Sequence, residues 1–280
     1  MLRLAAYTAV TIAVAAPALA QSIKGAVLDP SADNLRATWE NALVTVPAET
    51  PGGAPQQVKL KDLPPIAERR RPLVVFMHGS SGIAGFVKDY QTWLARDLGL
   101  ASIAPDSLAI ADRLTYRSPI DKPTYERVHG LRLAELRYAL DHAAELSWVD
   151  PDHIVVAGTS EGAVPVARLD DPRPVGRLLY AWSCEKNYFV EDDRTAIPRA
   201  TPVLAIIAAK DPYFSPMNPW NQGMSVTGTC TAALRDHTAA TVVTLSTDKH
   251  TVVNFPEARS LAGDFLERTL GIAPQPRPKP

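Results

Sequence analysis

The sequence predicts an α/β protein with a mostly parallel central β-sheet and helices on both faces. Three unbroken apolar runs, at 73–77, 154–157 and 202–208, are typical of strands that are buried on both faces. Segments with helical spacing separate these runs, and such alternation is the pattern of a parallel sheet covered on both sides. With 280 residues, of which 46% are apolar, the chain is long enough for one large domain of this class.

The first twenty residues have the features of a secretory signal peptide. Arg3 provides the positive start, residues 4–16 form an apolar run, and Ala18-Leu19-Ala20 is a small-x-small cleavage signature. The apolar run is shorter than the roughly 20 residues that a membrane-spanning helix requires. We therefore expect cleavage after Ala20 and a periplasmic or secreted protein with no membrane span. A retained N-terminal helix is the alternative.

The mature chain is expected to form one folded domain over residues 21–270, followed by a proline-rich disordered tail over residues 271–280. The formal net charge of −1 gives no reason to expect nucleic acid or an anionic membrane surface as a partner. The sequence has no CxxC motif and no histidine cluster, so we expect no metal site. A monomer and a homodimer are both compatible with the sequence.

The chain contains two cysteines, Cys184 and Cys230. An even number of cysteines in an exported protein is typical of a disulfide. Both lie in polar, loop-like sequence, which favours a bridge between two surface loops over a thiol in the core. Such a bridge contributes about 2–4 kcal/mol to stability if it is unstrained. Two free buried thiols are the alternative.

The first half of the domain is expected to contain a hairpin, two further strands and two helices. Proline and glycine mark most of the boundaries, because neither residue continues a regular element easily. In chain order, we expect strands at 43–46 and 57–60 joined by the loop 47–55, a strand at 73–77, a helix at 90–98, a strand at 100–104, an irregular stretch at 106–123 and a helix at 124–146.

The helix predicted at 124–146 is amphipathic. Apolar residues at helical spacing share one face, which we expect to pack on the sheet, and charged residues fall mostly on the other face. The apolar set is Val128, Leu131, Leu136 and Leu140, and the set expected outside is Arg127, Arg132, Glu135 and Arg137.

The second half of the domain continues the alternation of strands and helices. Pro256 suits the first position of the last helix, where its missing N–H removes no hydrogen bond. We expect a strand at 153–157, a helix at 163–167, strands at 175–182 and 202–208, a short helix at 231–237, a strand at 240–245 and a helix at 256–270.

Gly158-Thr159-Ser160-Glu161-Gly162 directly follows the apolar run 154–157. A serine at a sharp turn between a strand and a helix is held with its hydroxyl exposed. The flanking glycines are needed because a side chain there would collide with the neighbouring strand or helix. The five-residue pattern is common by itself, but a strand directly before it makes it informative. The pattern indicates that Ser160 is a nucleophile.

Three other polar segments also follow predicted strands. His78-Gly79-Ser80 follows the strand 73–77, Asp211 follows the strand 202–208, and His250 follows the last strand after a short loop. In a parallel sheet, ligands bind beyond the carboxyl ends of the strands. We therefore expect these segments to meet Ser160 at that edge.

Serine, histidine and aspartate are the parts of a nucleophilic triad. A serine hydroxyl is a poor nucleophile at neutral pH and needs a base within hydrogen-bond reach. His250 is expected to take the proton of Ser160 and to return it to the leaving group. Asp211 is expected to hold the imidazole in one tautomer. The backbone amides of Glu161 and Ser80 are the expected oxyanion-hole donors.

The other titratable candidates have simpler expected roles. Glu185 follows another strand and is the alternative for the triad acid. His78 is expected to anchor its loop by hydrogen bonding. The remaining histidines are expected to be ordinary surface or capping residues; these are His129, His142, His153 and His237.

Aromatic residues that follow strands are expected to line a substrate pocket. Trp182, Tyr188 and Tyr213 are the main candidates, and Phe189, Phe214 and Trp220 share their loops. The long stretch 106–123 also follows a strand, and loops of this length are often functional. We expect its Arg113 and Tyr116 to reach the substrate, where an arginine such as Arg113 or Arg117 suits a carboxylate. Whether this stretch is a lid stays open.

Together these motifs resemble the α/β-hydrolase superfamily, and in particular its dienelactone hydrolase-like branch. The resemblance covers residues 72–270 and rests on the segments 76–82, 158–162 and 208–212 and on His250. The order serine, aspartate, histidine along the chain is that of this superfamily. The resemblance implies an ester hydrolase without a cofactor. Dienelactone hydrolases usually carry cysteine as nucleophile, so Ser160 favours a serine esterase acting on a small-molecule ester.

Two other functions stay open. A peptidase or amidase of the prolyl-oligopeptidase type would use the same fold. Such enzymes generally carry an extra glycine directly after the five-residue turn around the serine, where this chain has Ala163. A catalytically inert binding module on this fold is the second alternative, and the complete set of triad residues argues against it.

Overall fold

The computed structural model describes residues 22–50, 52–67 and 69–273, so the expected signal peptide and most of the expected tail lie outside the described residues. The helices and strands, in chain order, are β1 (Ser22–Lys24), α1 (Ala32–Glu40), β2 (Leu43–Val46), β3 (Gln56–Lys59), β4 (Arg71–Met77), α2 (Gly85–Asp97), β5 (Ala101–Ala104), β6 (Thr115–Arg117), α3 (Lys122–Ala144), β7 (Val149–Thr159), α4 (Ala163–Arg168), β8 (Gly176–Tyr180), β9 (Val203–Ala208), β10 (Ala240–Leu245) and α5 (Pro256–Leu270).

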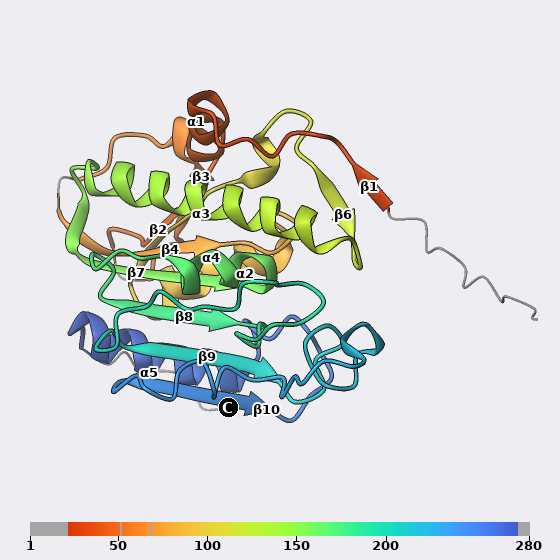
Figure 1. The fold of residues 1–280 in the computed structure, drawn as a ribbon. Coiled ribbons are helices and arrows are strands. Elements are labelled where there is room, and N and C mark those ends of the chain that lie inside the picture. The colour runs from red at the N-terminus through yellow and green to blue at the C-terminus, as the bar shows by residue number, and fades with distance from the viewer. Residues whose placement is uncertain (1–21, 51, 68, 274–280) are drawn as a thin grey trace, which may run out of the picture.

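Eight strands form the central sheet in the order β10-β9-β8-β7-β4-β5-β2-β3 (Figure 1). Only β2 runs opposite to the other seven strands, and it forms with β3 the expected hairpin, which lies at the sheet edge. All eight strands were predicted, each to within a few residues. The predicted class, a mostly parallel sheet with helices on both faces, is confirmed.

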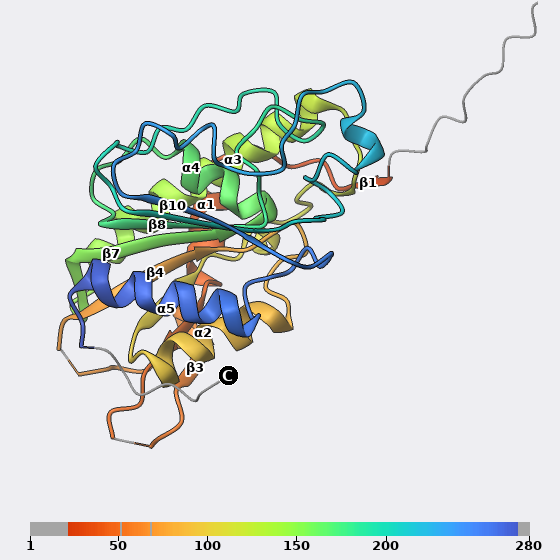
Figure 2. The ribbon, with the colours of Figure 1, turned by 90° about the horizontal axis from the view of Figure 1, so that it is seen from below.

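Side chains of β4 alternate between the two faces of the sheet. Leu73, Val75 and Met77 pack in the layer that also contains residues of α3 and α4, whereas Val74 and Phe76 pack with residues of α2 and α5. Figure 2 shows α1, α3 and α4 on one side of the sheet and α2 and α5 on the other. Each of these five side chains is fully buried. Since burial of a large aliphatic or aromatic side chain stabilises by about 1.5–3 kcal/mol, covering both faces accounts for the unbroken apolar run.

The direction of winding reverses between β4 and β7. From β4 the chain continues to β5, toward one edge of the sheet. From β7 it continues to β8, toward the opposite edge. The segments after β4 and β7 therefore part at the carboxyl edge of the sheet, which is where ligands bind in such folds. The long loops after β8 and β9 gather at the same edge (Figure 1).

The structure corrects several details of the prediction. Residues 231–237 form turns instead of a helix, because so short a segment makes too few backbone hydrogen bonds to offset the cost of starting a helix. The stretch 106–123 is not wholly irregular, since its strand β6 pairs antiparallel with β1. Helix α1 was not predicted, although Ser31 caps it by accepting a hydrogen bond from the amide of Asn34 at 3.4 Å.

Helix α3 buries two of the charged residues that were expected outside. Arg132 and Glu135 are both fully buried, whereas Arg127 and Arg137 are exposed as predicted.

Among the described residues, no helix combines the length and the apolar character that crossing a membrane requires.

Candidate active site

Ser160 lies at the turn between β7 and α4, with a backbone φ of +54°. A side chain is strained in this left-handed region by roughly 1–2 kcal/mol, so the surrounding structure must hold the turn. A Cβ on Gly158 would collide with the carbonyl of Gly162, and a Cβ on Gly162 would collide with the carbonyl of Met77 at the end of β4. Both glycines are therefore required by close approach, as the sequence predicted.

His250 and Asp211 form a hydrogen-bonded pair. The ring Nδ1 of His250 lies 2.8 Å from Oδ2 of Asp211, and Asp211 is fully buried. The other carboxylate oxygen, Oδ1, accepts hydrogen bonds from the backbone amides of Tyr213 at 2.9 Å and Phe214 at 3.1 Å. An ionised carboxylate only accepts, so Nδ1 of His250 carries the proton and Nε2 is free to act as a base.

Ser160 and His250 line one pocket of about 430 Å³. This volume is in the range of small-molecule sites. The His78–Ser80 loop forms part of the wall and approaches Ser160 closely, because a Cβ on Gly79 would lie 3.5 Å from the Cβ of Ser160. The lining residues are Gly79, Ser80, Ser81, Phe86, Tyr116, Arg117, Ser118, Thr159, Ser160, Tyr188, Phe189, Tyr213, Phe214, Trp220, His250 and Thr251.

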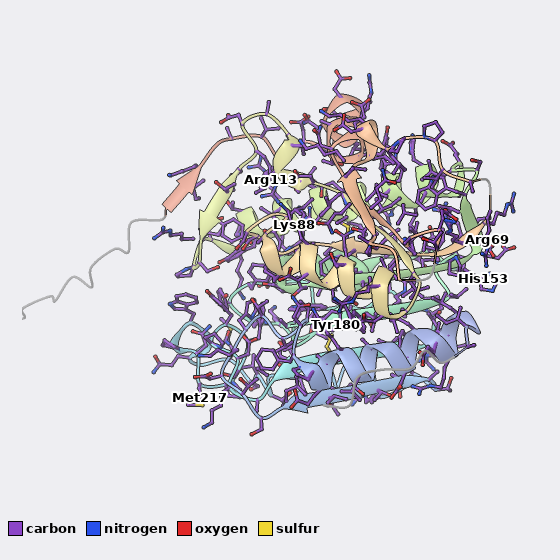
Figure 3. The ribbon with its side chains drawn as sticks, turned by 180° about the vertical axis from the view of Figure 1, so that it is seen from behind. Arg69, Lys88, Arg113, His153, Tyr180 and Met217 are labelled. Atoms are coloured by element: carbon purple, nitrogen blue, oxygen red, sulfur yellow. A yellow bond between two sulfur atoms is a disulfide. The ribbon has the colours of Figure 1, made fainter. Side chains whose placement is uncertain are left out.

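Three of the five predicted pocket residues line this pocket, namely Tyr116, Tyr188 and Tyr213. The prediction for the other two was wrong. Trp182 is 1% exposed and packs in the core, and Arg113 is buried in a cluster of charges behind the pocket. Figure 3 labels Arg113 on the segment between β5 and β6. Chain position after a strand brought both residues near the site, but only tertiary packing decides which side chains face the cavity.

The cluster behind the pocket joins Glu161 to two arginines. Glu161 accepts a hydrogen bond from Nη2 of Arg113 at 2.9 Å, and its other carboxylate oxygen accepts one from the hydroxyl of Tyr116 at 2.6 Å. Nε of Arg132 lies 3.5 Å from Glu161. Arg132 also binds Glu135 at 2.5 Å, so two cations and two anions share the buried space.

This arrangement keeps Glu161 charged. Burial by itself raises the pKa of Glu161, but the charges of Arg113 and Arg132 and the hydrogen bond from Tyr116 outweigh it and lower the pKa to about 2. Arg132 also donates to the carbonyl of His78 at 2.8 Å. The cluster thus ties together the two segments from which the oxyanion-hole amides are expected, the residue after Ser160 and the loop after β4.

The histidines other than His250 include two that are fully buried. The ring of His78 is fully buried, accepts from the amide of Ser107 at 3.1 Å and contacts the carbonyl of Gly79 at 2.7 Å, so it anchors its loop as predicted. Burial and the charge of Arg132 lower the pKa of His78 to about 3. His129, expected at the surface, is instead buried beside the carbonyl of Phe189, and burial lowers its pKa to about 4.

Glu185, the alternative triad acid, is occupied elsewhere. Its carboxylate accepts hydrogen bonds from the amide and hydroxyl of Thr227, at 2.9 and 2.6 Å, and from the amide of Gly228 at 2.9 Å.

The structure contains a disulfide between Cys184 and Cys230, with the two Cα atoms 4.7 Å apart. It connects the loop after β8 to the loop after β9, which carries Asp211.

Sequence reasoning did not select several residues of the pocket. Phe86 at the start of α2, Ser118 after β6 and Thr251 beside His250 all line it. Thr251 was detectable as a neighbour of His250, but Phe86 and Ser118 carry no local signal. Among the described residues, no group of three or more metal-ligating side chains is clustered.

No protein-family model matches the chain, and no curated protein matches its sequence. Several solved structures are similar in fold. A thermophilic esterase from the planctomycete Thermogutta terrifontis with bound propionate has 16% identity and a TM-score of 0.51, covering 84% of this chain and 91% of its own.

A protein described as m3DLH has 18% identity and a TM-score of 0.53, covering 72% of this chain and 88% of its own. A cold-adapted esterase from an Arctic intertidal metagenomic library has the same identity and TM-score, covering 72% and 84%. These likenesses confirm the α/β-hydrolase fold.

Proposed function

We propose that this α/β-hydrolase fold carries an exported serine hydrolase that cleaves a carboxylic ester. The observation that carries the proposal is the hydrogen-bonded pair of His250 and Asp211 on the same pocket as Ser160, which stands on a strained turn after β7. Two of the solved structures with this fold are described as esterases, which supports an ester as the substrate. The active form is a monomer or a homodimer.

Acylation begins with proton transfer from the Ser160 hydroxyl to Nε2 of His250. The Ser160 oxygen forms a bond to the ester carbonyl carbon, and the carbonyl oxygen becomes an oxyanion. The amides of Glu161 and Ser80 stabilise that charge. The bond to the alcohol oxygen then breaks, and His250 returns the proton to the departing alcohol. Asp211 stabilises the imidazolium while it exists.

Deacylation repeats these steps with water. His250 takes a proton from a water molecule, whose oxygen attacks the acyl carbon bound to Ser160. The acid leaves, and the proton passes back to the Ser160 oxygen. Every atom and proton is supplied by the ester, water and these side chains, so the reaction needs no cofactor.

The proposal is tested with a fluorophosphonate probe followed by peptide mass mapping. We expect covalent labelling at Ser160 that is lost in Ser160→Ala and strongly reduced in His250→Ala. Ser147→Ala, which changes an exposed serine before β7, is the matched control and keeps wild-type labelling. Protein that has not met the probe is assayed in parallel on short-chain esters and matched amides.

Each outcome separates the alternatives. Faster cleavage of esters than of amides supports the proposal, whereas a preference for amides or peptides identifies a peptidase or amidase. Folded protein that is not labelled and cleaves nothing contradicts the proposal and identifies an inert binding module.

A further inference from the structure

The pocket wall is unusually aromatic. Seven of its sixteen lining residues are aromatic, in a chain where aromatic residues make up 7% of the sequence. They come from four parts of the chain: α2, β6, the loop after β8 and the loop after β9. The seven are Phe86, Tyr116, Tyr188, Phe189, Tyr213, Phe214 and Trp220.

Five of these rings, those of the loops after β8 and β9, contact one another and reach His250. Tyr213 packs edge-to-face on His250 with ring centroids 4.6 Å apart, and Phe214 lies 5.8 Å from the same ring. Tyr188 packs edge-to-face on Trp220 at 5.1 Å, and Trp220 lies 6.2 Å from Tyr213. A substrate ring in this pocket would therefore meet ring faces and edges close to the ester-cleaving groups.

Some of these rings are buried in the wall, and others have surface that a substrate can contact. Tyr188, Phe189 and Phe214 are 6% exposed or less and support the wall from behind. Tyr213 and Trp220 are only half-buried, so their surfaces remain open to the cavity. Figure 3 shows the side chains of the loops after β8 and β9 gathered at one end of the sheet, with Met217 at their outer edge.

The wall is held in place before any substrate arrives. The side-chain oxygen of Asn221 accepts from the amide of Tyr188 at 3.2 Å, and its nitrogen donates to the carbonyl of Tyr213 at 3.2 Å, so it connects the two loops. The Cys184–Cys230 disulfide connects the same loops a second time. A preorganised wall loses little freedom when a ligand binds, so its contacts are retained as affinity.

We propose that the substrate is an ester that carries an aromatic ring, and that the ring lies against Tyr213 and Trp220. The proposal rests on the proposed ester hydrolysis and names its substrate class. Aromatic rings pack edge-to-face or offset with energies beyond those of area alone, which a saturated ring of equal size lacks. The pocket volume of about 430 Å³ accommodates one such ring together with the ester.

The test compares esters that differ only in ring saturation. Methyl benzoate is paired with methyl cyclohexanecarboxylate, and benzyl acetate with cyclohexylmethyl acetate, so that a ring on the acid side and a ring on the alcohol side are each examined. We expect kcat/KM to favour the aromatic member of at least one pair by about three- to tenfold. Equal values in both pairs would overturn the proposal, while hydrolysis of either ester would still support ester hydrolysis itself.

Variants locate the preference. In Trp220→Leu we expect the ratio of kcat/KM between the aromatic and the saturated ester to fall to within about twofold of unity. Phe255→Leu, a half-buried aromatic residue outside the pocket, is the matched control and keeps the wild-type preference. A preference that survives unchanged in Trp220→Leu contradicts the assignment to this wall.

Binding to Ser160→Ala gives a readout that does not need catalysis. We expect this variant to bind methyl benzoate or benzyl acetate several-fold more tightly than the saturated partner, measured by ligand-observed NMR. Equal binding of aromatic and saturated esters overturns the proposal even if the wild-type protein cleaves no ester. Tighter aromatic binding without any wild-type hydrolysis keeps the aromatic site and refutes the hydrolase.

Discussion

The charge cluster behind the pocket is expected to be a main source of local stability, and Arg113→Met tests this. The side chain of Arg113 is 2% exposed and makes hydrogen bonds to Ser107 at 2.7 Å, to the carbonyl of Leu114 at 2.7 Å and to Glu161 at 2.9 Å. Methionine keeps most of the apolar stem but removes the charge and all three bonds.

The size of the expected stability loss in Arg113→Met follows from the balance of charges in the cluster. Two arginines and two glutamates, Arg113, Arg132, Glu135 and Glu161, leave the buried cluster with no net charge. Removing one cation leaves Glu161 with Arg132 at 3.5 Å and the Tyr116 hydroxyl as its remaining partners. Removing one partner of a buried pair costs about 3–5 kcal/mol, because the other charge stays desolvated. We expect a loss of unfolding free energy of that size.

Urea unfolding followed by circular dichroism measures the loss. The double variant Arg113→Met/Glu161→Gln removes one charge of each sign, so we expect it to be more stable than the sum of the two single losses implies, by about 1–3 kcal/mol. Arg36→Met is the matched control, because Arg36 pairs with Asp33 at 2.7 Å on the surface, and it should change stability by less than about 1 kcal/mol.

Two results would refute this reasoning. An Arg113→Met variant within about 1 kcal/mol of the wild type would mean that the cluster is solvated or rearranges freely. Single losses that simply add in the double variant would mean that Arg113 and Glu161 do not interact energetically.

Three further predictions concern the histidines, the disulfide and Arg117. His78 and His129 have folded pKa values of about 3 and 4, below their ordinary value, so their stabilising contribution is complete above about pH 6.5 and is lost as the pH falls. The free energy of unfolding, measured by urea titration, should fall between pH 6.5 and pH 5 by up to about 1.4 kcal/mol per pH unit for each histidine, and His129→Gln should flatten that slope; an unchanged slope refutes this. Reduction of Cys184–Cys230 should cost about 2–4 kcal/mol and lower esterase activity by loosening the loop of Asp211, whereas mass mapping of free thiols in protein exported to the periplasm would contradict the bridge. Arg117 is exposed at the pocket and is the one lining residue with a permanent charge in the described part of the chain, so Arg117→Gln should lower kcat/KM for monomethyl terephthalate by up to about fivefold and leave methyl benzoate nearly unchanged; equal effects on both esters count against a role in binding the carboxylate.

Most of the fold was readable from the sequence because its signals are local. A strand buried on both faces must be apolar throughout. The apolar runs at 73–77 and 202–208 therefore predicted two buried strands of the sheet. The turn at Ser160 needs glycine on both sides for steric reasons that act within a few residues. The order of Ser160, Asp211 and His250 along parallel strands then predicted one shared edge, and the 2.8 Å contact between His250 and Asp211 agrees with it.

What the sequence left open depends on partners that are distant in the chain. Arg132 and Glu135 look like solvent-facing residues on an amphipathic helix, and nothing near them reveals the Arg113 and Glu161 charges that make their burial tolerable. Likewise, Trp182 and Tyr188 both follow β8 and both pack in the core, yet only Tyr188 also lines the pocket. Apolar pattern, chain order and turn chemistry are properties of short segments, so the sequence by itself determined the sheet, the turn at Ser160 and the order of the proposed triad. The neutral charge cluster and the aromatic wall were decided only by the tertiary structure, because each is a sum of contacts between segments that the fold alone brings together.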